Sequence, residues 1–154
     1  MYQKQDNRGY RPKWFELYEL LPPEVYTYQD LVSDKDQQPG WSYLDERLLI
    51  TLDIVRDIIG KPLICNTWCQ NGSRMNAGYR TIGCSVGAKK SMHKEGKAAD
   101  LLCRDYTAEE MRQIIIANQD KLPYPIRMEA DVTWLHIDVK DMDYKGRKIY
   151  IFKG

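Results

Sequence analysis

The clearest amphipathic pattern in the sequence runs over residues 44–59. Its apolar positions recur at intervals of three or four and share one face of a helix: Leu44, Leu48, Leu52, Val55 and Ile59. Ser42 followed by Asp45 resembles a helix start, and Gly60 with Pro62 ends the pattern. The sequence therefore predicts a helix here, with its apolar face in the core.

Two shorter stretches also have helical periodicity. The first covers residues 14–21 and is stopped by two consecutive prolines. The second begins at Thr107, which forms a predicted capping box with Glu110, and it ends before Pro123. We expect a short helix in each stretch.

Short apolar runs between turn residues predict strands at residues 62–67, 98–103, 126–129, 133–139 and 148–152. The third and fourth of these are expected to pair as a hairpin. The fifth is expected to join them after the turn at residues 143–146. Helices and strands together predict the α+β class, with helices packed on a small, mostly antiparallel sheet.

At 154 residues the chain has the size of one domain. We expect a single domain over residues 1–154, with residues 1–12 as a loosely held N-terminal tail. Residues 70–97 have no periodicity and contain glycines at positions 72, 78, 83, 87 and 96. A loop of this length in a compact domain is usually functional or disordered, and we favour function because a motif lies at its end.

Composition excludes several classes of function. Twenty-three Lys and Arg against twenty-two Asp and Glu give a formal charge of +1, so no basic face and no nucleic-acid partner are expected. The apolar runs fall far short of the ~20 residues that span a bilayer, so no membrane insertion is expected. No apolar stretch follows the basic N-terminal residues, which predicts a protein made in the cytoplasm without a signal peptide. We expect a monomer.

The four cysteines include no Cys-x-x-Cys pair, and a domain of this size does not need disulfides. Free thiols are therefore expected. Cys69 and Cys84 share the long loop with His93, which leaves a Cys-His zinc site or thiol chemistry open as an alternative. Neither spacing matches a standard motif.

The sequence has only two histidines, and each belongs to a polar motif. The motifs are Ser91-x-His93-x-x-Gly96-x-Ala98-x-Asp100 and Trp134-x-His136-x-Asp138. Imidazole and carboxylate suit zinc, and a catalytic zinc site has three protein ligands plus a water. His93 from the loop, Asp100 from the next strand and His136 from a distant strand could supply the three.

Side chains alternate in the expected strand at 133–139. Trp134, His136 and Asp138 share one face, and the residues between them form an apolar face that packs. Asp138 fits better as an acid behind a ligand than as a ligand, since three ligands are already assigned.

The two motifs together resemble the zinc D-alanyl-D-alanine carboxypeptidase and L-alanyl-D-glutamate endopeptidase superfamily, which cuts peptidoglycan peptides and shares its fold with the hedgehog signalling domain. The similarity covers roughly residues 41–139. It extends upstream through Gly78-Tyr79-Arg80 and, more weakly, through Asn66-x-Trp68 and Leu44-Asp45-x-Arg47-Leu48. The size and the missing signal peptide are similar to those of phage-encoded members, which act on the cell wall as endolysins or virion lysins.

The resemblance implies that His93, Asp100 and His136 hold one zinc ion, and that Arg80 and Ser91 contact a peptidoglycan stem peptide. The planar donor fork of arginine suits a carboxylate. Without the resemblance, Arg80 would be interpreted as a surface or ion-pair residue, and Ser91 would be interpreted as a loop cap.

The sequence departs from the family pattern at the general base. Many members carry a glutamate three residues before the second histidine, and here that position is Thr133. Along one extended strand Glu129 would lie ~23 Å from His136, too far to act. If residues 130–132 form a turn, Glu129 lies opposite Thr133 and returns to the site. We take Glu129 as the base, with Asp131 as the alternative and an inactive site as a third possibility.

The leading hypothesis is a zinc peptidase, either an endopeptidase or a D,D-carboxypeptidase. The bound metal would lower the pKa of its water to ~7, and Glu129 would take the proton. Arg80 would orient a carboxylate of D-Ala, D-Glu or diaminopimelate, and Ser91 would hold the substrate backbone. The alternative is a non-catalytic zinc or peptidoglycan-binding domain on the same fold, in which the displaced acid marks lost catalysis.

Overall fold

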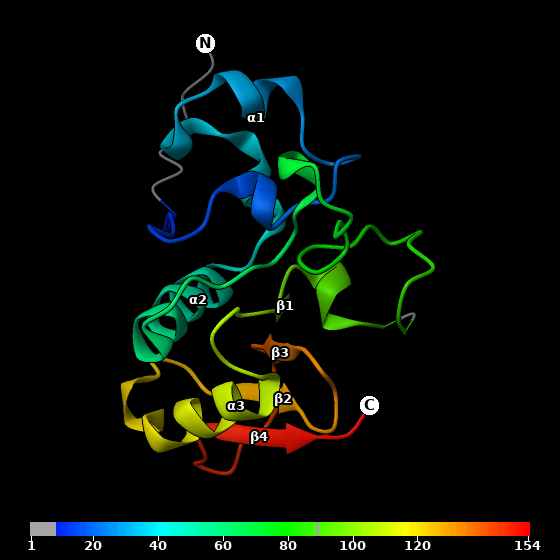
Figure 1. Ribbon diagram of the computed structural model, residues 1–154. Coiled ribbons are helices and arrows are strands. Elements are labelled where there is room, and N and C mark those ends of the chain that lie inside the picture. Colours follow the sequence, from blue (N-terminus) through cyan, green and yellow to red (C-terminus); the bar gives the residue numbers. More distant parts are fainter. Residues whose placement is uncertain (1–8, 89) are drawn as a thin grey trace.

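The computed structural model describes residues 9–88 and 90–154, and its elements belong to the α+β class, as predicted (Figure 1). The α-helices and strands are α1 (Tyr28–Val32), α2 (Glu46–Ile59), β1 (Ala98–Leu101), α3 (Ala108–Ala117), β2 (Ile126–Glu129), β3 (Leu135–Asp138) and β4 (Ile149–Phe152). Short 3-10 helices lie at Leu17–Glu19, Lys35–Gln37, Pro39–Tyr43, Trp68–Gln70, Met92–Glu95 and Gln119–Lys121. In the described part of the chain no helix is long and apolar enough to cross a membrane.

The four strands form one mixed sheet in the order β1-β3-β2-β4. β3 pairs antiparallel with both β1 and β2, whereas β4 pairs parallel with β2. The expected hairpin of β2 and β3 is present. The last strand does not continue a simple meander. After β3 the chain crosses β2 and adds β4 at the edge of the sheet, parallel to β2.

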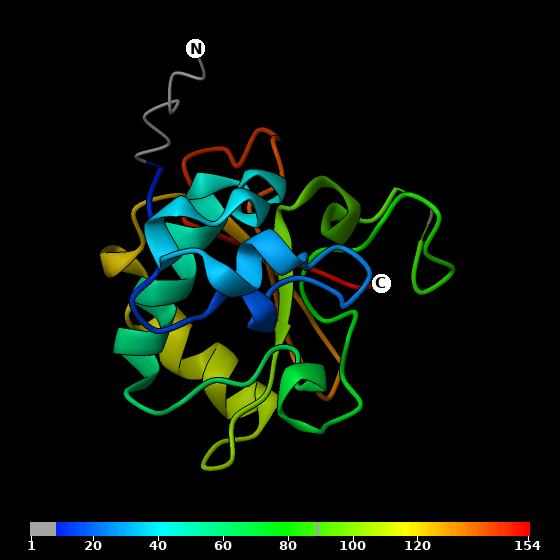
Figure 2. The same cartoon turned by 90° about the horizontal axis from the view of Figure 1, so that it is seen from above.

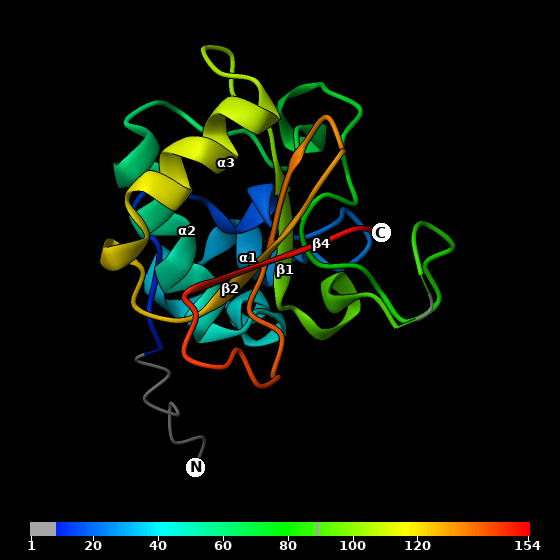
Figure 3. The ribbon, with the colours of Figure 1, turned by 90° about the horizontal axis from the view of Figure 1, so that it is seen from below.

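The two faces of the sheet have different chemistry. One face is apolar and fully buried in the core, through Ala99, Leu101, Ile126, Met128, Leu135 and Ile137. Figure 3 shows α2 and α3 on one side of the strands and the loop before β1 on the other. Alternation places Asp100, His136 and Arg127 on the face away from the helices.

The two long helices follow their sequence signals closely. Asp45 caps α2 by accepting a hydrogen bond from the Arg47 amide at 2.8 Å, and Gly60 ends the helix in the left-handed conformation with φ 74°. Ser42 has a different role from the one expected, because its hydroxyl donates to the Pro39 carbonyl within a 3-10 helix. The predicted capping box of Thr107 opens α3.

Two predicted elements are mostly replaced by irregular structure. Within residues 14–21 only Leu17–Glu19 is helical. Within residues 62–67 only Ile64 forms a β-bridge, to Leu102 directly after β1. Asn66 accounts for the second difference, because its amide bonds the Glu19 carbonyl while its side chain bonds the Leu21 carbonyl and the Ala77 amide. These contacts replace the ladder that a strand would need.

The N-terminal segment that the structure describes is attached to α2. The Tyr10 amide donates to Glu46 at 2.9 Å, and the Tyr10 hydroxyl donates to Asp53. The remainder of the expected tail, residues 1–8, lies outside the described residues. All four cysteines are free, as expected.

Candidate metal centre

The three predicted ligands come from three separate segments. His93 belongs to the 3-10 helix Met92–Glu95, Asp100 to β1 and His136 to β3, where Asp100 and His136 are direct cross-strand partners. Gly96 ends the 3-10 helix at φ 69°, and a Cβ there would lie 1.9 Å from the Tyr43 carbonyl oxygen. Only glycine fits this turn, which returns the chain from His93 to β1.

The ligand atoms of His93, Asp100 and His136 converge. They all lie within 4.8 Å of one another. Asp100 Oδ1 lies 3.2 Å from His93 Nε2 and 2.9 Å from His136 Nδ1. All three residues are at most 9% exposed. The group could hold a metal ion, and its two nitrogens and one oxygen suit a transition metal such as zinc.

Each histidine has a partner on the nitrogen that faces away from the centre. His93 Nδ1 lies 2.8 Å from the Gly78 carbonyl, which can only accept, so this nitrogen carries the hydrogen and Nε2 is left for a metal. His136 Nε2 lies 2.7 Å from Asp138 Oδ2, which leaves Nδ1. Such outer partners fix ring orientation in metal sites.

Asp138 is in turn held by Arg127 across the sheet. The guanidinium makes two parallel hydrogen bonds to the Asp138 carboxylate, at 2.9 and 2.8 Å, and Asp138 is completely buried. The side chain of Arg127 stacks 4.0 Å from the ring of Phe152 in β4. A chain of contacts therefore runs from β4 and β2 to the candidate ligand His136.

The electrostatics of the cluster favour a cation at its centre. Burial opposes the charge of Asp100, but its close contacts with His136 and His93 hold its pKa well below the usual range. Burial likewise opposes a charged His136, but Asp100 and Asp138 raise its pKa to about 9. Two carboxylates around one ring attract positive charge, and a divalent cation would satisfy the same field.

Arg80 and Ser91 border the same group. Arg80 donates from Nε to the Asn76 carbonyl at 2.8 Å and from Nη2 to Asp100 Oδ2 at 3.3 Å, and it is 8% exposed. Ser91 accepts a hydrogen bond from the His93 amide and so caps the 3-10 helix. Arg80 therefore forms an ion pair and Ser91 caps a helix, which are the two alternatives that the sequence left open. Both residues also line the cavity described next.

A cavity of about 400 Å³ contains the group. Besides the three candidate ligands, its wall includes Arg80, Lys90, Ser91, Arg127, Glu129, Trp134 and Phe152. Figure 2 shows that residues 81–88 of the long loop extend away from the body of the fold.

Glu129 reaches the cavity, but in a different register from the one expected. Arg127 pairs with Asp138 and Met128 with Ile137, so the next pair along the ladder sets Glu129 beside His136. The expected pairing of Glu129 with Thr133 is wrong. The connection between the strands is longer than a three-residue turn, because it includes residues 130–134.

Asp131, the alternative base, lies in that connection. Its backbone is left-handed, with φ 62°, and its carboxylate pairs with Lys153 at 3.2 Å. The side chain is 74% exposed, and Asp131 is not among the residues that line the cavity. Cys69 and Cys84 are likewise absent from the candidate ligand group.

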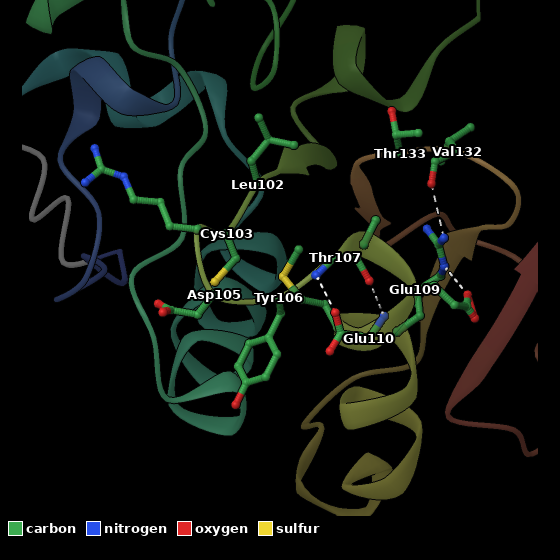
Figure 4. A pocket seen from close by; sticks show the side chains of 13 residues that line it. Leu102, Cys103, Asp105, Tyr106, Thr107, Glu109, Glu110, Val132 and Thr133 are labelled. Atoms are coloured by element: carbon green, nitrogen blue, oxygen red, sulfur yellow. Dashed lines mark hydrogen bonds and ion pairs between the residues drawn. The ribbon is translucent and has the colours of Figure 1, made fainter.

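Arg112 of α3 holds the β2–β3 connection in place. Its guanidinium donates to the carbonyls of Glu129, Val132 and Trp134 at 3.1 to 3.3 Å, and its side chain is 6% exposed. It borders a second hollow, of about 560 Å³, which lies at the start of α3 and is lined by none of the candidate ligands (Figure 4).

Two functional residues, Arg112 and Arg127, were not predicted from the sequence. The signal for Arg127 was present, because it alternates with buried Ile126 and Met128 and so shares a face with Glu129. Its partner Asp138 could be assigned only with the observed register. Arg112 lies on the buried side of α3, where a charged residue requires partners that the sequence does not reveal.

Comparisons with models of protein families, with curated proteins and with solved structures give no match to this chain.

Proposed function

We propose that this protein is a zinc-dependent peptidase that hydrolyses an amide bond in peptidoglycan stem peptides, as an endopeptidase or a D,D-carboxypeptidase. The observation that carries the proposal is the convergence of His93, Asp100 and His136 in a cavity that Glu129 also lines. The class of substrate rests on the resemblance of the two sequence motifs to the zinc peptidase superfamily with a hedgehog-like fold.

When bound, zinc would supply an acidified water and an electrophile that polarises the scissile carbonyl. Glu129 would accept the proton of that water and later give it to the leaving amine, since the β2–β3 register sets it beside His136. Arg80 would present its guanidinium edge to a substrate carboxylate, and the hydroxyl of Ser91 would bond the substrate backbone.

The alternative is a non-catalytic zinc domain that binds peptidoglycan. The observation that favours it is the absence of a glutamate at position 133, where the resembling family often has its base. Against it, the candidate group has three protein ligands among the described residues, and a catalytic zinc site keeps its fourth position open.

One experiment separates the two functions. Purified, zinc-loaded protein is incubated with peptidoglycan of several chemotypes, and the released muropeptides are identified by mass spectrometry. A peptidase gives new termini at one type of bond, and Glu129→Gln reduces the rate by about 10²–10⁴ with zinc retained. Asp131→Asn is the matched control and is expected to keep full activity.

Two outcomes would contradict these assignments. If zinc-loaded wild-type protein cleaves no chemotype, the peptidase proposal is wrong and the binding domain is favoured. If Asp131→Asn is inactive while Glu129→Gln is fully active, the base has been assigned to the wrong acid.

A further inference from the structure

The described wall of the cavity at the candidate metal centre includes three Lys and Arg residues, which are Arg80, Lys90 and Arg127. The two arginines are already paired with carboxylates. Arg80 lies 3.3 Å from Asp100, and Arg127 lies 2.8 Å from Asp138. Lys90 differs from both, because its ammonium group forms no ion pair or hydrogen bond with any described residue.

The backbone next to Lys90 is fixed, although its side chain is free. The Ser91 amide donates to the Ala88 carbonyl at 3.1 Å, which closes a turn that includes Lys90. The Ser91 hydroxyl accepts a hydrogen bond from the amide of His93, one of the candidate ligands. Lys90 is therefore held at the border of the site, where its exposed side chain lines the cavity.

Arg80 has little freedom to follow a substrate. Its Nε donates to the Asn76 carbonyl, and its Nη2 donates to Asp100. Gly87 packs against the remaining nitrogen, because a Cβ at residue 87 would lie 2.6 Å from Nη1. Arg80 can therefore serve a carboxylate at only one fixed position, and a further anionic group of the substrate needs another cation.

The charges that remain in the cavity favour an anionic substrate. Apart from the two paired arginines and Asp100, the charged wall residues are Lys90 and Glu129, and Glu129 forms no ion pair with the described residues either. A divalent ion at the candidate ligands would add two positive charges. Positive charge then exceeds negative charge, and the flexible stem of a lysine lets its ammonium group reach a carboxylate.

We propose that Lys90 binds a free carboxylate of the substrate and so gives the enzyme a preference for acidic peptides. The inference rests on the proposed peptidase function, and it adds a second carboxylate contact to the one proposed for Arg80. Stem peptides carry such groups on D-Glu, on diaminopimelate and at a C-terminal D-Ala. Amidation of any one of them removes the charge and nearly preserves the shape.

The test uses a pentapeptide stem and three versions of it, each with one of these carboxylates amidated. kcat/KM for each is measured with zinc-loaded protein, and affinity is measured by calorimetry in the zinc-loaded Glu129→Gln background. Lys90→Gln removes the positive charge, and Lys90→Arg keeps it. Lys94→Gln is the matched control, because it makes the same change of charge four residues away and Lys94 does not line the cavity.

We expect wild-type protein to bind and cleave the free peptide about fivefold better than one of the amidated versions. Lys90→Gln should lose this discrimination, whereas Lys90→Arg and Lys94→Gln should keep it. The discrimination should also weaken as salt is raised, because the ammonium group of Lys90 is exposed to solvent and its ion pair is screened.

Three outcomes would overturn the role of Lys90 and leave the peptidase proposal standing, provided that the peptides are cleaved. The first is that wild-type protein treats the free and amidated peptides alike. The second is that Lys90→Gln keeps every discrimination of wild type, which would assign the carboxylate to another cation such as Arg80. The third is an equal loss in Lys90→Gln and Lys94→Gln, which would show a general effect of charge.

The affinity measurements separate this inference from the proposed function. If no peptide is cleaved but the affinity for the free carboxylate depends on Lys90, the contact stands and the peptidase proposal fails. If the peptides are neither bound nor cleaved, both fail.

Discussion

At the scale of single residues, every candidate ligand is held by a second contact. His93 is fixed by the Gly78 carbonyl, His136 by Asp138, and Asp100 by Arg80. These contacts fix the orientation of the three side chains that would bind the ion. Preorganised ligands lose little freedom on binding a metal.

The ligand assignment is tested by removing one ligand at a time. His93→Ala, Asp100→Ala and His136→Ala should each lower zinc content well below one ion per chain, since two remaining ligands bind weakly. Elemental analysis of dialysed protein measures the occupancy. Asp131→Ala is the control, because it removes an exposed carboxylate near the site. Full zinc retention in all three ligand variants would refute the assignment.

Asp138 is expected to act through His136. Asp138→Asn keeps the shape of the side chain but removes the carboxylate that binds His136 Nε2 and Arg127. Loss of such an outer partner typically lowers metal affinity 10–100-fold, which a competing chelator can measure. Asp141→Asn is the control, because Asp141 forms ion pairs with Arg47 and Lys97 and is 64% exposed. The metal affinity of this variant should match that of wild type. Equal affinities for wild type and Asp138→Asn would contradict this role.

At the scale of elements, the sequence predicted those whose signals are local. α2 and α3 carry their own caps and apolar stripes, and β2 has the predicted bounds 126–129. The segments 14–21 and 62–67 were not predicted correctly, because their backbone groups bond distant partners such as Asn66 and Glu19. The parallel pairing of β4 is also non-local, and nothing in residues 148–152 specifies it.

The candidate site was predictable to the extent that its residue types carry chemistry. Histidines are scarce here, and their two motifs identify the group that the structure brings together. The path by which Glu129 reaches the cavity was not predictable, because it depends on a five-residue connection and its support from Arg112. The register differs by three residues from the expected one, which changes the cross-strand neighbour of Glu129 from Thr133 to His136.

Arg112 is expected to stabilise that connection. Arg112→Lys retains the charge but cannot span three carbonyls, so it should lower the free energy of unfolding by about 2–4 kcal/mol. Urea denaturation measures the change. Glu109→Gln is the matched control, since it removes only the 61% exposed partner of Arg112 and should cost under about 1 kcal/mol. Equal losses in the two variants would show that the carbonyl contacts contribute little.

At the scale of the whole molecule, the candidate metal centre joins parts of the fold that are distant in sequence. The loop before β1, β1 itself and β3 meet there, and Arg127 and Phe152 connect the group to β2 and β4. The unfolded chain does not hold these ligands together. A metal that binds only the folded form must therefore stabilise the entire domain.

This linkage gives a thermal prediction that does not depend on any substrate. Free zinc at 100 times its Kd should stabilise the folded state by about 2.7 kcal/mol, which for a domain of 154 residues raises Tm by about 5–11 °C. Differential scanning calorimetry of chelator-treated protein, with and without added zinc, measures the shift. His136→Ala should abolish it, because His136 is the ligand contributed by β3, whereas Asp131→Ala should leave it intact. If His136→Ala shows the same rise in Tm as wild type, the stabilising ion binds elsewhere. If wild-type protein binds one zinc per chain without a rise in Tm, the ion also binds the unfolded chain.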